Sequence, residues 1–234
     1  MLFLFDLLID TCYTNGKYVN DCGGDLMPLE PLKIKDLLLA AAGEIADHVE
    51  ILTELDCALG DGDHGTTMKK LTNVMFDEIK TWNQTTNLKT GLESLTDALE
   101  DVSGGSAGPL FGAFIYGMAE AADPDAPNTD TFIKSILLGA YDEFFATSKA
   151  VVGDKTMMDA IYPATEVIRS STADMKTTLK KAAQAARTGS DNTTGMLAKF
   201  GRARYIGDRC LGHKDPGSVT FAFFYEGLAK GYLA

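Results

Sequence analysis

Cysteine is sparse in this chain, and no Cys-x-x-Cys pair occurs. The four cysteines are Cys12, Cys22, Cys57 and Cys210, spread over 234 residues. This spacing matches neither a disulfide framework nor a zinc site. A reducing cytoplasm is therefore the expected location.

Basic residues are also few. Lys and Arg number 21 against 33 Asp and Glu, so the formal net charge is −12. A field of this sign repels phosphate backbones and anionic lipids, so we expect neither nucleic-acid binding nor binding to an anionic membrane. A phosphate ligand is still compatible where metal ions neutralise its charge locally.

Membrane spans and strand patterns are missing as well. The opening MLFLFDLLID is interrupted by Asp6, lacks a basic start, and is too short to cross a bilayer. No long stretch alternates between apolar and polar residues, and the one strand-like segment, YIGDRCLGH, is interrupted by glycines. The hydrophobic share of 45% and the charged share of 23% are typical of a globular domain.

Helical periodicity dominates the rest of the chain. Apolar residues recur at threes and fours from Ile34 to Leu55. Similar spacing predicts seven further helices, at about 65–81, 88–102, 108–122, 130–148, 155–171, 173–187 and 217–232. We therefore expect one all-α domain over residues 31–234. Residues 1–30 are interpreted as an N-terminal extension, with a short docking helix as one interpretation.

The connections between these helices are rich in Gly, Asp, Ser and Thr. They read LGDGDHGTT, SGGSAGP, VVGDKT, RTGSDNTTG and LGHKDPGS. Loops on a rigid scaffold are common places for binding groups. Asp215 followed by Pro216 predicts a helix N-cap with proline at the first helical position.

The first of these loops holds three carboxylates, Asp56, Asp61 and Asp63, within eight residues. Unpaired, they would repel one another, and a hard divalent cation relieves that repulsion by taking oxygen ligands. The glycines in this loop permit positive φ and close approach of a ligand. A solvated helix cap explains the same pattern equally well. His64 by itself is more typical of a structural role than of a catalytic one.

Two better-known binding motifs do not match this loop. GDGDHG matches Gly-x-Gly-x-x-Gly, but a dinucleotide fingerprint requires a preceding strand, and a helical pattern precedes this loop. An EF-hand counted from Asp61 would need glycine at its sixth position and an acidic residue at its twelfth, and both are absent.

The remaining loops are individually ambiguous. The small residues of 103–112 suit either a ligand close to the backbone or tight helix packing. Residues 152–158 lack the full phosphate-loop spacing, and Met157 suits either the core or the wall of an adenine pocket. Arg202 offers a planar fork for phosphate, and the helix start at Asp215 offers free N–H groups. Together, the loops favour a magnesium–nucleotide site at one end of a helical bundle.

Four blocks, taken in order, carry a family resemblance. They are LGDGDHGTTM, SGGSAGPLFGAF, GDKTMMDAIYPA and GRARYIGDRCLGHKDPGS. Together they resemble the nucleotide-binding L subunit, or L domain, of dihydroxyacetone kinases, over about Ile34 to Tyr232. The resemblance implies an eight-helix antiparallel barrel that binds ADP or ATP through two Mg²⁺ ions at one end.

The resemblance also assigns residues. The metal ligands would be Asp56, Asp61 and Asp63. The nucleotide contacts would be His64, Gly65, Thr66, Thr67, Ser106, Ala107, Ser148, Met157, Arg202, Asp215, Pro216 and Gly217. Ser148 stands where the family has glycine, and Ser106-Ala107 reverses the more usual order. Arg202 would anchor the nucleotide or add positive charge.

The implied activity is phosphoryl transfer to dihydroxyacetone held on a separate K subunit, without activity on the triose alone. A free-standing chain resembles the branch in which bound ADP is recharged by a phosphohistidine protein of the phosphotransferase system. Two alternatives stay open: an ATP-dependent kinase component for another substrate, and a nucleotide-sensing subunit that contacts a transcriptional regulator. A homodimer is also expected.

Overall fold

The computed structural model describes residues 11–14, 17–20, 30–83, 86–123 and 129–232. Its helices are α1 (Glu30–Ala46), α2 (Val49–Leu59), α3 (His64–Ile79), α4 (Leu88–Glu100), α5 (Ala107–Glu120), α6 (Thr129–Ser148), α7 (Met158–Ser170), α8 (Met175–Asn192) and α9 (Pro216–Gly231). Two short 3₁₀ segments, η1 (Thr193–Gly195) and η2 (Ala203–Cys210), lie between α8 and α9. The described residues are thus overwhelmingly helical, as the periodicity predicts. The strand-like YIGDRCLGH lies largely in η2.

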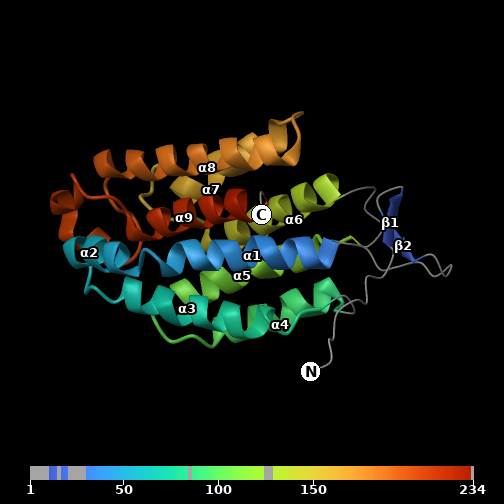
Figure 1. Ribbon diagram of the computed structural model, residues 1–234. Helices are drawn as coiled ribbons and strands as arrows, with labels where there is room; N and C mark the ends of the chain where they lie inside the picture. Colours follow the sequence, from blue (N-terminus) through green and yellow to red (C-terminus); the bar gives the residue numbers. More distant parts are fainter. Residues whose placement is uncertain (1–10, 15–16, 21–29, 84–85, 124–128, 233–234) are drawn as a thin grey trace, which may run out of the picture.

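Eight of the helices close into a ring. In chain order α3 to α9 each pack on the next, and α1 packs on both α9 and α3. Neighbouring helices run in opposite directions (Figure 1). The expected eight-helix antiparallel barrel is therefore confirmed, with α2 as an additional short helix at one end.

The first predicted helix is split in two at residues 47–48. His48 has φ −118° and ψ 17°, which are not helical values, and its N–H bonds the Ile45 carbonyl at 3.1 Å. The His48 ring stacks on Phe223 of α9 with centroids 4.0 Å apart. Phe223 is 175 residues away in sequence, so local periodicity carries no sign of this contact at the break between α1 and α2.

The barrel interior is filled by aromatic side chains. Five phenylalanines from α5, α6 and α9 are fully buried and pack with centroid separations from 4.8 to 6.5 Å: Phe111, Phe114, Phe144, Phe221 and Phe224. Most pairs are edge-to-face, the arrangement that aromatic quadrupoles favour. This packed core holds the helix ends, and hence the loops between them, in fixed positions.

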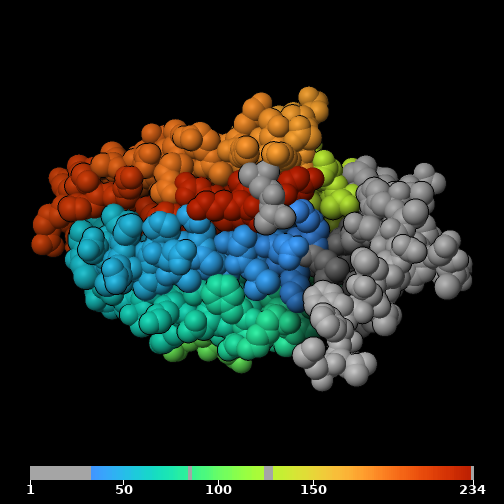
Figure 2. All heavy atoms as spheres, in the orientation of Figure 1, coloured from blue at the N-terminus to red at the C-terminus, as the bar shows by residue number. Residues whose placement is uncertain are grey.

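All the glycine-rich loops lie at the same end of the barrel. Because consecutive helices alternate in direction, the α2–α3, α4–α5, α6–α7 and α8–α9 connections meet there, at the left of Figure 1. In Figure 2 the α8–α9 segment and α2 form the tip of the molecule at this end. The topology therefore gathers motifs as far apart in sequence as residues 59–67 and 211–218.

The N-terminal extension contains a hairpin where the sequence suggested a short helix. Strands β1 (Thr11–Thr14) and β2 (Lys17–Asn20) pair antiparallel, with Thr11 opposite Asn20 and Thr14 opposite Lys17. The connecting dipeptide Asn15-Gly16 is a common hairpin sequence, which was an available signal. The docking-helix interpretation is wrong for these residues, and the rest of 1–30, apart from Glu30, lies outside the described residues. Among described helices, none combines the length and apolar character that crossing a bilayer requires.

Candidate functional site

The three predicted metal ligands converge. Asp56 lies in the last turn of α2, and Asp61 and Asp63 lie in the turn that leads into α3. One carboxylate oxygen from each is within 4.8 Å of the other two. Gly62 makes this turn possible: its φ is +76°, and a Cβ there would lie 2.7 Å from the Cys57 sulfur.

Positive charge already faces this cluster. The Arg202 guanidinium contacts the Asp61 carboxylate and lies 3.4 Å from Asp63, while Asp56 accepts a hydrogen bond from the His64 N–H at 3.1 Å. Because three carboxylates at this spacing repel one another, a cation stabilises them. A set made only of carboxylate oxygens is the donor chemistry of hard ions such as Mg²⁺ or Ca²⁺. The residues therefore fit a divalent metal.

His64 links the start of α3 to the start of α9. Its Nε2 is 2.8 Å from the Thr220 hydroxyl, which itself donates to the Pro216 carbonyl at 3.0 Å. Because the Thr220 hydroxyl proton points to the Pro216 carbonyl, the hydroxyl oxygen accepts a hydrogen bond from His64, so Nε2 carries the imidazole proton. Burial lowers the pKa of His64 to about 4, which leaves the ring neutral at neutral pH. The ring is a neutral donor that positions two helix ends.

A cavity of about 710 Å³ opens beside the acidic cluster. Its size is in the range of small-molecule sites. Pro109, Leu110 and Phe144 form an apolar wall, and the acidic cluster lies on its rim. Twelve of the fifteen predicted site residues line it: Asp56, Asp61, Asp63, His64, Ser106, Ala107, Ser148, Met157, Arg202, Asp215, Pro216 and Gly217.

The other three predicted residues are in the first turn of α3, outside the lining. Gly65 packs against the backbone of α2, where a Cβ would collide with the Val49 carbonyl. Thr67 is buried against Gly104, and Thr66 is exposed. Helix packing explains Gly65 and Thr67, and a nucleotide contact through their backbone stays a prediction.

Sequence reasoning missed part of the lining. Phe144 precedes Ser148 by four positions on α6, so helical spacing from Ser148 was a usable signal for it, and Thr147 follows Phe144 by three. Leu59 and Phe200 also line the cavity. Leu59 opens the LGDGDHGTT loop, whereas no local pattern singles out Phe200.

Lys155 lines the cavity, but its ammonium group is held by backbone carbonyls. Its side chain is buried, at 2% exposure, and Nζ donates to the carbonyls of Thr193 and His213, each at 2.5 Å. Its φ is +59°, rare for a residue with a side chain. Burial lowers the pKa of the ammonium group. One ammonium thus joins both ends of the α8–α9 segment.

Asp215 caps α9 as the sequence predicts. Its Oδ2 accepts from the Ser218 N–H at 2.6 Å, and Pro216 is the first helical residue. The Asp215 N–H donates to the Thr193 hydroxyl at 2.9 Å. Burial raises the pKa of this carboxyl to about 7 despite the hydrogen bond from Ser218.

Two substitutions at Asp215 distinguish the contribution of its N-cap hydrogen bond to stability from the contribution of its ionisation. Asp215→Ala is expected to lower the free energy of unfolding by about 1 kcal/mol, the usual cost of a lost cap, while Asp215→Asn keeps an acceptor. The folded-state pKa, about 7, exceeds the unfolded value of 3.8, so the folded state binds more protons between these values. This contribution to stability is therefore lost as pH rises through that window.

Chemical denaturation across the same pH window measures this effect. The stability of Asp215→Asn relative to the unsubstituted chain is expected to increase as pH rises. If the difference in free energy of unfolding between Asp215→Asn and the unsubstituted chain stayed constant over this pH range, the raised pKa of Asp215 would be contradicted.

Fold and site together define a class of protein: a helical barrel whose loops at one end hold a carboxylate cluster for divalent cations beside a ligand-sized cavity. The model of the DAK2 domain matches residues 58–230. The chain therefore belongs to the DAK2 domain family, which confirms its resemblance to the L-type domains of dihydroxyacetone kinases.

Named relatives come from several bacteria. The ADP-binding subunit of the PEP-dependent dihydroxyacetone kinase of Escherichia coli is 30% identical over 206 residues, covering 87% of this chain and 98% of that subunit. The ADP-binding subunit of the PEP-dependent dihydroxyacetone kinase 2 of Listeria innocua is 36% identical over 177 residues, covering 73% of this chain and 81% of that subunit.

Solved structures support the fold. The dihydroxyacetone kinase of C. freundii superposes with a TM-score of 0.64 at 24% identity, covering 84% of this chain. This chain spans about a third of that kinase (34%). A second structure of the same kinase, with the same TM-score, contains AMP-PNP and Mg²⁺.

Proposed function

We propose that this chain is the nucleotide-binding, phosphoryl-transferring subunit of a dihydroxyacetone kinase. It would pass phosphate from a Mg²⁺-bound nucleotide to dihydroxyacetone held on a separate K-type subunit. The observation that carries the proposal is the convergence of Asp56, Asp61 and Asp63 within 4.8 Å beside a cavity of about 710 Å³.

Each part of the site has a role in this proposal. Asp56, Asp61 and Asp63 would hold two Mg²⁺ ions, which when bound offset the negative charge of the phosphates during transfer. Arg202, which contacts Asp61, would add positive charge beside the cluster. The apolar wall would hold the base and exclude water.

The N-terminus of α9 would favour the anionic end of the ligand. Pro216 and Gly217 line the cavity at this helix start, where the helix dipole is positive. Phosphoryl transfer depends mainly on positioning and charge neutralisation, so the chain needs no covalent step of its own. The acceptor hydroxyl would be that of dihydroxyacetone, held at the cavity by the K-type partner.

The names of the bacterial relatives support the phosphoenolpyruvate-dependent branch. The similar ADP-binding subunits of E. coli and L. innocua are named as parts of PEP-dependent dihydroxyacetone kinases. A relative in Lactococcus lactis, 30% identical, is named as dependent on the phosphotransferase system. We therefore propose that bound ADP is recharged in place by a phosphohistidine protein. A homodimer and contact with a transcriptional regulator stay predictions.

Reconstitution tests the function. Freshly purified protein is expected to contain ADP and magnesium by mass spectrometry, with ADP surviving dialysis. Dihydroxyacetone phosphate should form only with both the K-type subunit and the phosphohistidine donor. Free exchange with ATP that supports turnover would favour the ATP-dependent alternative. Bound nucleotide without turnover under any of these conditions would favour a sensor.

A further inference from the structure

The turn between α6 and α7 forms one wall of the cavity. Lys155, Thr156 and Met157 line the cavity there. The Met157 side chain also lies against the start of α9, because a Cβ added at Gly217 would come within 2.8 Å of the Met157 Cγ. The course of this turn therefore decides where one apolar side chain and one hydroxyl face a ligand.

The backbone of this turn is strained. Gly153 has φ +95° and Lys155 has φ +59°, and the left-handed region is unfavourable for a residue with a side chain. Such a conformation persists only where the surrounding structure imposes it, and it is common at ligand-binding sites. Other contacts must therefore hold the turn in place.

Packing alone does not support the turn from behind. A second cavity, of about 500 Å³, lies there and is lined in part by Val152, Asp159 and Met196. Among the described residues, none lines both cavities. The turn is therefore a wall between two open spaces, and its rigidity depends on hydrogen bonds.

Asp159 supplies these hydrogen bonds from the side of the second cavity. It is the second residue of α7, and it is only 1% exposed. Its Oδ1 accepts a hydrogen bond from the Gly153 N–H at 2.6 Å, and its Oδ2 accepts one from the Thr156 N–H at 2.8 Å. Hydrogen bonds to a carboxylate are stronger than those to a neutral acceptor. One carboxylate thus fixes the turn on both sides of the strained residue Lys155.

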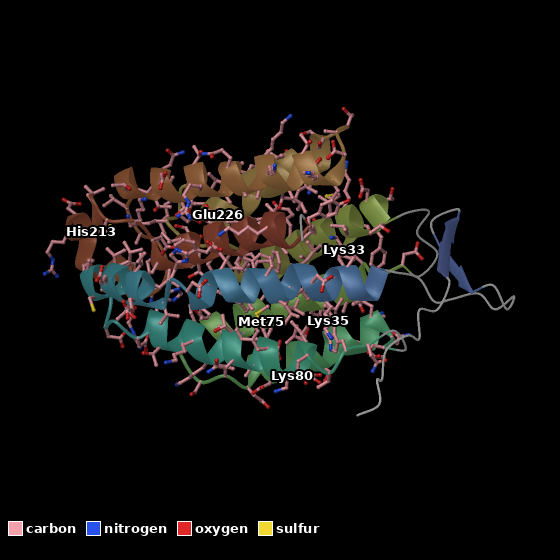
Figure 3. All side chains as sticks on the ribbon, viewed as in Figure 1. Lys33, Lys35, Met75, Lys80, His213 and Glu226 are labelled. Carbon is pink, nitrogen blue, oxygen red and sulfur yellow. The ribbon has the colours of Figure 1, made fainter. Side chains whose placement is uncertain are left out.

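Two further contacts join the turn to the α8–α9 segment. The Lys155 ammonium group donates to the His213 carbonyl at 2.5 Å, and the Asp154 carboxylate pairs with Lys199 at 2.7 Å. Figure 3 shows His213 at this end of the barrel and Lys33 toward the other. These contacts anchor the turn to one neighbouring segment, whereas Asp159 anchors it to α7.

We propose that Asp159 is a positioning residue for nucleotide binding, which holds this turn so that Thr156 and Met157 face the nucleoside part of the ligand. The inference rests on the proposed function. An apolar side chain suits a base or a ribose, whereas the charged phosphates are expected at the acidic cluster and its metal ions. Asp159 lies outside the cavity lining, so it acts through the turn and not by touching the ligand.

Asp159→Asn tests this role. The asparagine side chain places a donor against one of the two backbone N–H groups, so one hydrogen bond is lost. Asp130→Asn is the matched control, because Asp130 accepts from the Met175 N–H at 3.1 Å and from the Tyr232 hydroxyl at 2.6 Å, outside the cavity lining. Calorimetry on nucleotide-free protein measures the Mg²⁺-dependent affinity for ADP, and competition against ADP measures that for inorganic pyrophosphate.

Asp159→Asn is expected to bind ADP about tenfold or more weakly, the effect that supporting groups around a site commonly have. Its affinity for pyrophosphate, which lacks the nucleoside, should be unchanged. Asp130→Asn should bind both ligands like the unsubstituted chain, even if urea unfolds it equally early.

Gly153→Ala disturbs the same turn without altering α7. Its Cβ would meet no atom within 4 Å, so the fold should survive, but φ +95° is unfavourable for alanine. It is expected to show the same selective loss of ADP affinity, and it decides the question if Asp159→Asn does not fold.

Equal ADP affinity in the turn variants and in Asp130→Asn would overturn the positioning role. So would a parallel loss of ADP and pyrophosphate affinity, because Asp159 would then support the site as a whole. Failure of the proposed function gives a different result: the unsubstituted chain would show no Mg²⁺-dependent ADP binding, or pyrophosphate would not compete with ADP.

Discussion

Asp61→Asn is expected to weaken Mg²⁺-dependent ADP binding by about 100-fold or more while the fold survives. The change removes one charge from the three-carboxylate cluster, and loss of a direct ligand costs at least as much as the 10–100-fold that supporting groups contribute. Asp61 is exposed and lies in a turn, so the core does not depend on it. Isothermal titration calorimetry with and without magnesium measures the effect.

Asp97→Asn is the matched control, since it makes the same change at an exposed position on α4, outside the cavity lining. It should bind ADP normally. Normal ADP affinity in Asp61→Asn, with helical circular dichroism intact, would remove the metal-cluster assignment and the proposed function with it.

Lys155→Met is expected to lower the free energy of unfolding by about 3 kcal/mol. Methionine preserves most of the side-chain volume but removes two hydrogen bonds from a charged donor, each worth about 1.5–3 kcal/mol, while the Thr193 carbonyl keeps its hydrogen bond from the Met196 N–H. Release of both ends of the α8–α9 segment should also weaken ADP binding, since this segment carries Arg202 and Asp215. Urea denaturation and calorimetry measure the two effects.

Lys214→Met provides the comparison within the same segment. Lys214 pairs with Asp191 at 2.6 Å, and both side chains are substantially exposed, so its loss should cost no more than about 1 kcal/mol. Limited proteolysis should cut between Thr193 and Asp215 faster in Lys155→Met than in Lys214→Met. Equal stability and equal cleavage of the two variants would show that Lys155 does not join the segment.

The local sequence was sufficient to predict that the three carboxylates lie close together. Asp56, Asp61 and Asp63 are close in the chain, and the turn at Gly62 forms from glycine's own conformational freedom. The cap at Asp215 was equally local, because an N-cap bonds a backbone group three residues ahead. Both features form between residues that are close together in the chain, so they can be predicted from the sequence.

Other features required the assembled barrel. At the break between α1 and α2, His48 stacks on Phe223, and Lys155 donates to carbonyls 38 and 58 residues away. The contact of Arg202 with Asp61 joins residues on two separate connections. None of these partners is identifiable until the helices have closed into a ring.

Residue spacing alone determined the helical class, the positions of most helices and the three carboxylates that are candidates for a metal site, because periodicity and turn chemistry act over a few residues. The tertiary structure decided which loops share one end of the barrel, which basic groups face the carboxylates and which apolar side chains stay exposed. Those outcomes depend on packing between segments far apart in the chain, where the free energy of burial and the alternation of helix direction, not local preference, set the arrangement.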